Sequence, residues 1–124
     1  MKLLLDTHSA LWWVSGDERF GPTAERLMLD PDAQVLLSAV VVWKITVKQT
    51  VGKLTAPPTW SEALLAGGAT ELPITLRHAA KVSDLPDHHR DPFDRLLVAQ
   101  ALVEDATLVS RDSALHPYGA AIAW

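Results

Sequence analysis

The stretch MKLLLDTHSALWW, residues 1–13, sets a pattern that recurs along the chain. A short apolar run, Lys2 to Asp6, ends in an acid and has the composition of a buried strand. Thr7 or His8 then begins a helix that carries several apolar residues, and Gly16 is expected to end it. A strand followed at once by a helix is the repeating unit of α/β folds.

The same alternation continues to the end of the chain. The strands are apolar throughout, which is typical of a parallel sheet covered by helices on both faces. The sequence therefore predicts a single α/β domain over residues 1–124, an α/β/α sandwich around a mostly parallel central sheet. After the first strand and helix, we expect helices at 23–29, 39–51, from about 60, at 79–82 and at 92–104, and strands at 35–38, 71–75, 107–110 and 120–123.

Length and composition limit the class of protein. A chain of 124 residues with 48% hydrophobic content can form a packed core, and the absence of cysteine excludes a disulfide scaffold and a thiolate zinc site. The apolar stretches are too short to span a bilayer, and the early acid does not fit a secretory signal, so we expect a soluble cytoplasmic protein. The net charge of −4 argues against nucleic-acid binding by global electrostatics, but it is compatible with an acidic metal-dependent site.

Three acids are expected at one end of the predicted sheet. Asp6 and Asp112 follow predicted strands, and Asp94 lies in the first turn of a helix that Asp91 caps. Ser38 ends another strand at the same edge, where α/β proteins place their functional groups. Each acid alone is also explained as a helix cap or turn residue. Together they indicate a site for a hard divalent cation, which phosphoryl chemistry uses to activate water.

Four segments resemble, in the right order, the motifs of PIN-domain ribonuclease toxins of the VapC type. The resemblance covers nearly the whole chain, and HRDPFDRLL is its most specific part. It implies a compact, usually dimeric α/β/α fold that cuts RNA with Mg²⁺ or Mn²⁺, and that is bound by a cognate VapB-type antitoxin. Transfer RNA and messenger RNA are both candidate substrates. The matching segments are MKLLLDTHSALWW, LLSAVVVWKITVKQTVGKL, HRDPFDRLLVAQA and TLVSRDSAL.

The resemblance also implies a set of site residues. Three of the four catalytic acids of the family correspond to Asp6, Asp94 and Asp112, which would hold the metal. The fourth corresponds to position 44, where the family has glutamate and this chain has lysine, in the element Trp43-Lys44-Ile45. The residues expected to support the acids are small or acidic: Thr7, Ser38, Asp91 and Ser110.

Lys44 changes the chemistry expected of this site. It raises the formal charge of the acidic cluster by roughly two units, and a charge pair at 4 Å interacts by about 4 kcal/mol at an effective dielectric of 20. The ammonium can pair with Asp6 or Asp94, and it can take the space that a cation would fill. We therefore expect weak Mg²⁺ binding and slow or absent RNA cleavage.

Three interpretations of Lys44 stay open at this point. It inactivates a nuclease, or the chain is a degenerate, catalytically dead PIN module that only binds an antitoxin. The third is a surface lysine on a helix turned away from the site. An apolar face of Val40, Trp43, Val47 and Val51, which Lys44 borders, argues against the third. A signalling receiver domain is a weaker rival, because Ser38 and not an aspartate ends the second predicted strand, and Arg111 and not a lysine follows the strand that ends at Ser110.

Other residues near the acids have both functional and simpler interpretations. The neighbouring His88 and His89 do not face the same way, so we expect an exposed loop and not a metal site. Trp12 and Trp13 cannot both point inward, so one is available to cover a dimer interface or an antitoxin groove. Three arginines beside the acids could contact RNA phosphates or could pair with carboxylates: Arg90, Arg95 and Arg111.

Overall fold

The computed structural model describes residues 1–87 and 91–124. His88, His89 and Arg90, for which the sequence suggested an exposed loop and a phosphate contact, lie outside the described residues. The strands are β1 (Lys2–Leu5), β2 (Gln34–Ser38), β3 (Thr70–Leu72), β4 (Thr107–Val109) and β5 (Ile122–Ala123). The helices are α1 (Thr7–Ser15), α2 (Pro22–Met28), α3 (Ala39–Thr50), α4 (Trp60–Ala66), α5 (Leu76–Lys81) and α6 (Pro92–Glu104), with 3-10 helices η1 (Val82–Asp84) and η2 (Ser113–Tyr118).

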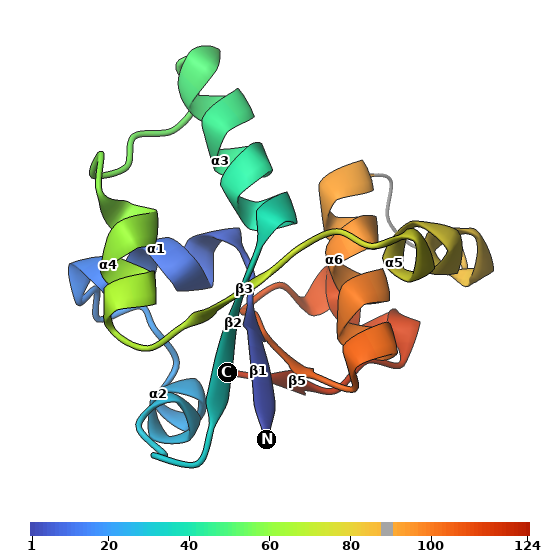
Figure 1. Cartoon of the computed structure of the whole chain (residues 1–124), viewed down its shortest axis with the longest axis horizontal. Helices are drawn as coiled ribbons and strands as arrows, with labels where there is room; N and C mark the ends of the chain where they lie inside the picture. The colour runs from blue at the N-terminus through green and yellow to red at the C-terminus, as the bar shows by residue number, and fades with distance from the viewer. Residues whose placement is uncertain (88–90) are drawn as a thin grey trace.

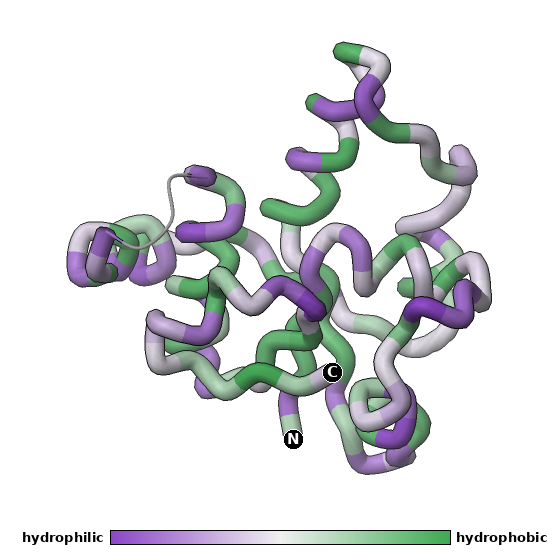
Figure 2. The backbone as a smooth tube through the Cα atoms, turned by 180° about the vertical axis from the view of Figure 1, so that it is seen from behind, coloured by the Kyte–Doolittle hydropathy of each residue, from purple (hydrophilic) through white to green (hydrophobic). Residues whose placement is uncertain are grey.

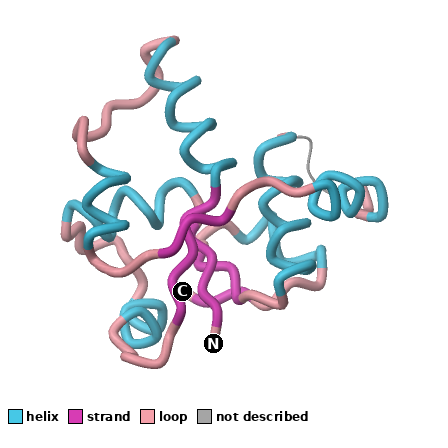
Figure 3. The backbone as a smooth tube through the Cα atoms, viewed as in Figure 1, coloured by secondary structure: helices cyan, strands magenta, loops and turns pink. Residues whose placement is uncertain are grey.

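The described strands form one sheet in the order β3-β2-β1-β4-β5, and every neighbouring pair is parallel. Figures 1 and 3 show α1, α2 and α4 on one side of this sheet and α5 and α6 on the other, with α3 rising from the end of β2. The predicted α/β sandwich is therefore confirmed, and the sheet is wholly parallel where the sequence predicted a mostly parallel one.

One local prediction needs correction. The strand expected at residues 71–75 ends at Leu72, because Pro73 has no N–H to continue the ladder of hydrogen bonds. The simpler interpretation of Asp112 as a cap residue is confirmed, because its side chain accepts a hydrogen bond from the backbone N–H of Ala114 at the start of the 3-10 helix η2.

The chain reverses its direction of strand addition next to β1. It adds β2 and β3 on one side of β1 and then returns to add β4 and β5 on the other side. In open parallel sheets, ligands bind beyond the carboxyl ends of the strands at such a switch point. Asp6 follows β1, Ser38 ends β2 and Ser110 follows β4, so three neighbouring strands deliver these side chains to one place.

The core lies along the central strands, which form the most hydrophobic part of the trace in Figure 2. Leu3, Leu4 and Leu5 of β1 are fully buried, since helices cover both faces of the sheet. Among residues 1–87 and 91–124, no helix is long and apolar enough to cross a membrane.

Helix α3 buries a different face from the one its apolar pattern suggests. Val41, Lys44 and Ile45 are buried, whereas Trp43 is 53% exposed and Val51 is 60% exposed. The apolar stripe of α3 therefore faces outward over much of its length, and Lys44 lies on the inner face.

A buried polar network fixes the start of α3 against α5 and α6. Ser38 accepts a hydrogen bond from the N–H of Val40 and donates its hydroxyl to the side-chain oxygen of Gln100. The Gln100 amide contacts Nδ1 of His78 at 3.3 Å, and Nε2 of His78 donates to Glu104 at 2.9 Å. This hydrogen bond holds the pKa of the Glu104 carboxyl below its usual range.

Candidate active site

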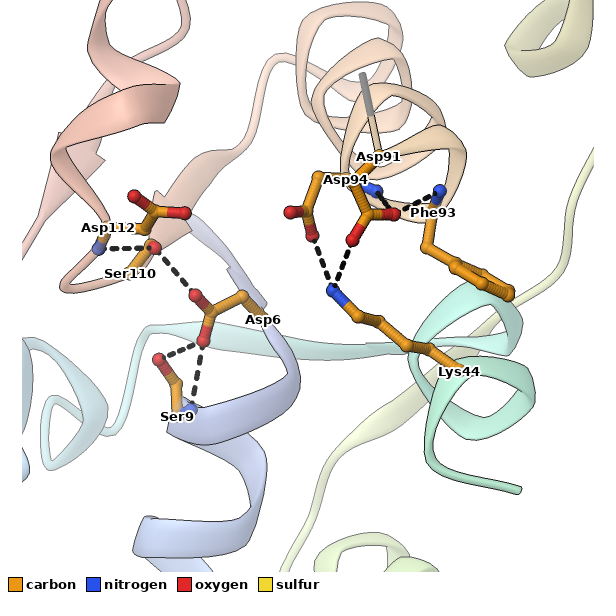
Figure 4. A network of polar contacts seen from close by, with 8 residues as sticks. All are labelled: Asp6, Ser9, Lys44, Asp91, Phe93, Asp94, Ser110 and Asp112. Carbon is orange, nitrogen blue, oxygen red and sulfur yellow. Dashed lines mark hydrogen bonds and ion pairs between the residues drawn. The ribbon is translucent and has the colours of Figure 1, made fainter. Parts of the chain in front are cut away.

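Asp6 is fixed by hydrogen bonds to both of its side-chain oxygens. Oδ1 accepts from the backbone N–H of Ser9 at 2.9 Å and from its hydroxyl at 2.6 Å, which caps α1. Oδ2 accepts from the hydroxyl of Ser110 at 2.6 Å. The cap interpretation and the site interpretation of Asp6 are therefore compatible, because the same carboxylate begins the helix and faces the end of β4 (Figure 4).

Ser110 joins Asp6 to the segment that carries Asp112. Its hydroxyl donates to Asp6 and accepts from the backbone N–H of Asp112 at 3.0 Å. Ser110 is 2% exposed, so these bonds form away from bulk water. The Asp112 side chain is exposed and lies beside this hydroxyl in Figure 4.

Ser110→Ala should therefore destabilise the protein by about 1–2 kcal/mol, because the change removes the hydrogen bond to Oδ2 of Asp6 and the hydroxyl that accepts from the N–H of Asp112. Urea unfolding measures this effect. Ser113→Ala, at an exposed serine of the same segment, is the matched control and should change stability by less than about 0.5 kcal/mol. Equal effects of the two changes would rule out the bridging role of Ser110.

Lys44 lies between two carboxylates of α6. Its Nζ is 3.0 Å from Oδ2 of Asp91 and 3.0 Å from Oδ1 of Asp94 (Figure 4). The Lys44 side chain is 11% exposed and that of Asp94 is 15% exposed, so water screens this pair less than a surface pair. Asp91 also begins α6, since its Oδ1 accepts from the N–H groups of Phe93 and Asp94.

The ion pair shifts both of the pKa values that are resolved for it. Burial lowers the pKa of Lys44, but the charges and hydrogen bonds of Asp94 and Asp91 outweigh burial and raise it above its ordinary value. Burial raises the pKa of Asp91, but the hydrogen bond and charge of Lys44, with two backbone N–H donors, hold it below its usual range. The Lys44 ammonium and the Asp91 carboxylate therefore both favour the charged state at neutral pH.

The predicted acids lie in one region and form two sets, and hydrogen bonds or ion pairs join the residues within each set. Figure 4 shows Asp6, Ser110 and Asp112 on one side and Asp91 and Asp94 with Lys44 on the other. The sequence named Asp6 or Asp94 as the partner of Lys44, and the described contacts are to Asp94 and Asp91. Of the remaining supporting residues, Thr7 is buried at the start of α1 and Ser38 lies in the network behind α3.

The described side chains do not fit a divalent cation while Lys44 is present. One Asp94 oxygen already faces an ammonium at 3.0 Å, and that ammonium repels a cation. Within the described ranges, no group of three or more histidine, cysteine or acidic side chains is arranged to hold a metal ion. The metal-ligand roles of Asp6, Asp94 and Asp112 stay predictions.

Arg95 holds the backbone that precedes α6. Its guanidinium donates to the carbonyl of Pro86 at 2.9 Å and to that of Val82 at 3.3 Å. Its expected contact with RNA therefore has no support in these bonds. Arg111, by contrast, is exposed and lies over the ring of Trp12.

Sequence reasoning missed two residues. Ser9 doubles the hydrogen bonds to Asp6, and its spacing of three residues after an N-cap was a readable signal. Gln100 is fully buried in an otherwise apolar helix face, and only the presence of a polar residue there could have drawn attention to it.

A protein-family model described as the PIN domain matches residues 3–120. The chain belongs to the PIN-domain family. PIN-domain nucleases generally use divalent metals, which agrees with acids gathered at the switch point of the sheet. A search of the curated proteins finds no match to this chain.

Solved structures with a PIN-like fold include proteins of toxin–antitoxin complexes. VapBC2 from Rickettsia felis, bound to a promoter DNA fragment, aligns with a TM-score of 0.72 and 14% identity over 99% of this chain and 98% of that one. FitAcB from Neisseria gonorrhoeae aligns with a TM-score of 0.61 and 22% identity over 97% and 95%. The sarcin–ricin-loop-cleaving toxin VapC20 from Mycobacterium tuberculosis aligns with a TM-score of 0.65 and 19% identity over 95% of each chain. At these identities the likeness shows a VapC-like fold.

Proposed function

We propose that this PIN domain is a VapC-type endoribonuclease toxin in which Lys44 suppresses metal-dependent cleavage. The observation that carries the proposal is the position of the Lys44 ammonium, 3.0 Å from Asp91 and from Asp94. A cation of the protein itself then neutralises acids that a nuclease would use for Mg²⁺ or Mn²⁺. The proposed substrate is RNA, with transfer RNA as one candidate, and the proposed partners are a VapB-type antitoxin and a second copy of the chain.

In this proposal the acids keep the roles that they have in an active relative. Asp6, Asp94 and Asp112 would hold the cation if position 44 carried glutamate, and the cation would supply activation of water and neutralisation of phosphate charge. Ser9 and Ser110 hold Asp6 in place through the hydrogen bonds described above. Lys44 itself stays protonated and so cannot act as a general base.

A second candidate is a catalytically dead PIN module that only binds an antitoxin. An exposed apolar surface suits such binding: Trp43 and Leu65 line a hollow of about 370 Å³ between α3 and α4. Several of the matched structures are toxin–antitoxin complexes, among them one from Klebsiella pneumoniae. The two candidates share antitoxin binding and differ in whether the site retains latent activity.

Lys44→Glu separates them. The unchanged chain should leave labelled RNA intact in Mg²⁺ or Mn²⁺, and Lys44→Glu should cleave it at least about a hundredfold faster, because a metal-binding penalty of about 3 kcal/mol is removed. A chelator should abolish this cleavage. Adding Asp94→Asn to Lys44→Glu should abolish it as well.

Each outcome of this assay decides something. Equal cleavage by the unchanged chain and Lys44→Glu would refute suppression by Lys44. If neither chain cleaves RNA, and Lys44→Glu remains folded, the binding module is the correct candidate.

A further inference from the structure

Two residues that are next to the acids in the chain, His8 and Arg111, each lie against the same indole ring, that of Trp12. His8 lies two positions after Asp6, and Arg111 lies directly before Asp112. The ring of His8 is 5.4 Å from the ring of Trp12, and the guanidinium carbon of Arg111 is 5.9 Å from the Trp12 centroid. Helix α1 and the segment after β4 therefore each place one group, an imidazole and a guanidinium, against Trp12, close in the chain to Asp6 and Asp112.

Arg111 has no competing use within the described residues. It is exposed, and no hydrogen bond or ion pair engages its guanidinium in the described part of the chain. The second arginine over the same indole differs. Arg19 lies 4.8 Å from the Trp12 centroid, but it donates to both oxygens of Asp17, at 3.0 and 2.7 Å.

The pairing of Arg19 with Asp17 is strong enough to shift an exposed carboxyl. The hydrogen bond from the Arg19 side chain lowers the pKa of Asp17 to about 2. The charge of Arg19 is therefore already neutralised by a neighbour, whereas that of Arg111 is available to an anion.

Trp12 is held as a rigid platform for these groups. Its ring also packs at 5.7 Å from that of Trp124, which in turn contacts Phe20. Trp13 packs against Phe20 in the same aromatic cluster, and Trp12 and Trp13 are both half-buried. The expectation that one of them covers a partner surface stays a prediction. The exposed groups on Trp12 whose side chains make no hydrogen bond or ion pair within the described residues are the imidazole of His8 and the guanidinium of Arg111, whereas Arg19 is paired with Asp17.

An exposed ring and a free guanidinium together suit a nucleotide of single-stranded RNA. Bases stack on aromatic side chains whatever their identity, and a guanidinium binds phosphate with two parallel hydrogen bonds. An acidic peptide would pair with the guanidinium, but its acidic side chains have no base to stack on the imidazole ring. Because the net charge is −4, the protein cannot hold RNA by overall positive charge, and RNA binding would depend on local cations such as Arg111.

We infer that His8, Trp12 and Arg111 form a subsite for one nucleotide of single-stranded RNA, with the base stacked against His8 and the phosphate on Arg111. This subsite lies beside Asp6 and Asp112 and positions RNA at the candidate active site. The inference rests on the proposed function for its choice of RNA, but it concerns binding and does not require cleavage.

The test measures binding of the unchanged, non-cleaving chain to a fluorescein-labelled single-stranded RNA by anisotropy. Arg111→Gln should weaken binding roughly fivefold to tenfold, and His8→Ala should weaken it about fivefold. Arg19→Gln is the matched control: it makes the same change in charge over the same indole and should alter affinity by less than about twofold. Circular dichroism melts check that the variants are folded.

An abasic ribose-phosphate oligomer separates the two halves of the subsite. Arg111→Gln should weaken binding of this oligomer as well, whereas His8→Ala should leave it unchanged. The inference is overturned if Arg19→Gln and Arg111→Gln weaken RNA binding equally, or if His8→Ala has no effect on RNA. It is also overturned if a polyglutamate peptide displaces RNA as effectively as unlabelled RNA does.

Failure here is distinguishable from failure of the proposed function. If Lys44→Glu cleaves RNA while the binding variants behave like the unchanged chain, only the subsite is wrong. If the subsite variants weaken binding but Lys44→Glu does not cleave, RNA binding stands and suppressed catalysis falls.

Discussion

Lys44→Glu should lower the melting temperature of the metal-free protein by about 5–15 °C, and millimolar Mg²⁺ or Mn²⁺ should restore much of the loss. The change replaces an ammonium that touches Asp91 and Asp94 with a third carboxylate. Loss of the attraction and gain of repulsion should cost about 2–4 kcal/mol, after an allowance for partial exposure of the acids. Differential scanning fluorimetry with and without metal measures both effects.

A matched control is available one turn along the same helix. Lys48→Glu makes the same change in charge at a half-buried lysine of α3, but without the contact to Asp91 and Asp94. It should cost no more than about 1 kcal/mol, which is the size of a helix-terminus effect, and it should give no response to metal. A melting temperature of Lys44→Glu that is insensitive to both cations would show that these acids do not converge on a metal.

A second variant, Lys44→Met, distinguishes the effect of adding a carboxylate at position 44 from the effect of removing the ammonium. Lys44→Met keeps an unbranched side chain that reaches as far as Cε, and it removes the cation that contacts Asp91 and Asp94. It should destabilise the protein by about 1–3 kcal/mol, because the loss of one partner leaves charged groups partly buried. Metal should stabilise it less than it stabilises Lys44→Glu, which adds a carboxylate ligand.

Gln100→Leu should have a comparably large effect from behind the site. It removes the acceptor of the Ser38 hydroxyl and the amide that contacts His78 and the carbonyl of Pro73. These groups are buried, so the change should cost about 2–4 kcal/mol in urea unfolding. Because Ser38 caps α3, hydrogen exchange in the first turn of α3 should also accelerate.

Gln49→Leu makes the same chemical change at an exposed position of α3. It should alter stability by less than about 0.5 kcal/mol and leave exchange at the start of the helix unchanged. If Gln100→Leu behaves like Gln49→Leu, the buried network does not hold α3 and its contribution to the position of Lys44 must be abandoned.

Local sequence signals predicted most of the elements because each has its own chemistry. Asp91 followed by Pro92 fixed the start of α6, and the apolar run ending in Asp6 fixed the end of β1. The parallel sheet then followed from apolar strands that alternate with helices, and the convergence of strand-end residues followed from the sheet.

The partners within the site could not be predicted in the same way. Lys44 meets Asp91 as well as Asp94 because of how α3 and α6 pack, and no local pattern specifies that packing. The apolar stripe along α3 did not predict which of its residues are buried, since Trp43 and Val51 are exposed. Lys44, which borders the stripe, is buried. Burial of a lysine becomes possible only when two carboxylates arrive from another helix.

The two ends of the sheet limit how two copies of the chain can associate. The edge strands are short, with three residues in β3 and two in β5. Each edge therefore offers few free backbone groups for pairing with another sheet, and intermolecular strand addition is disfavoured. A dimer that forms through helix side chains would instead have exposed apolar groups to bury, among them Trp43 of α3, Leu65 of α4 and Leu76 of α5.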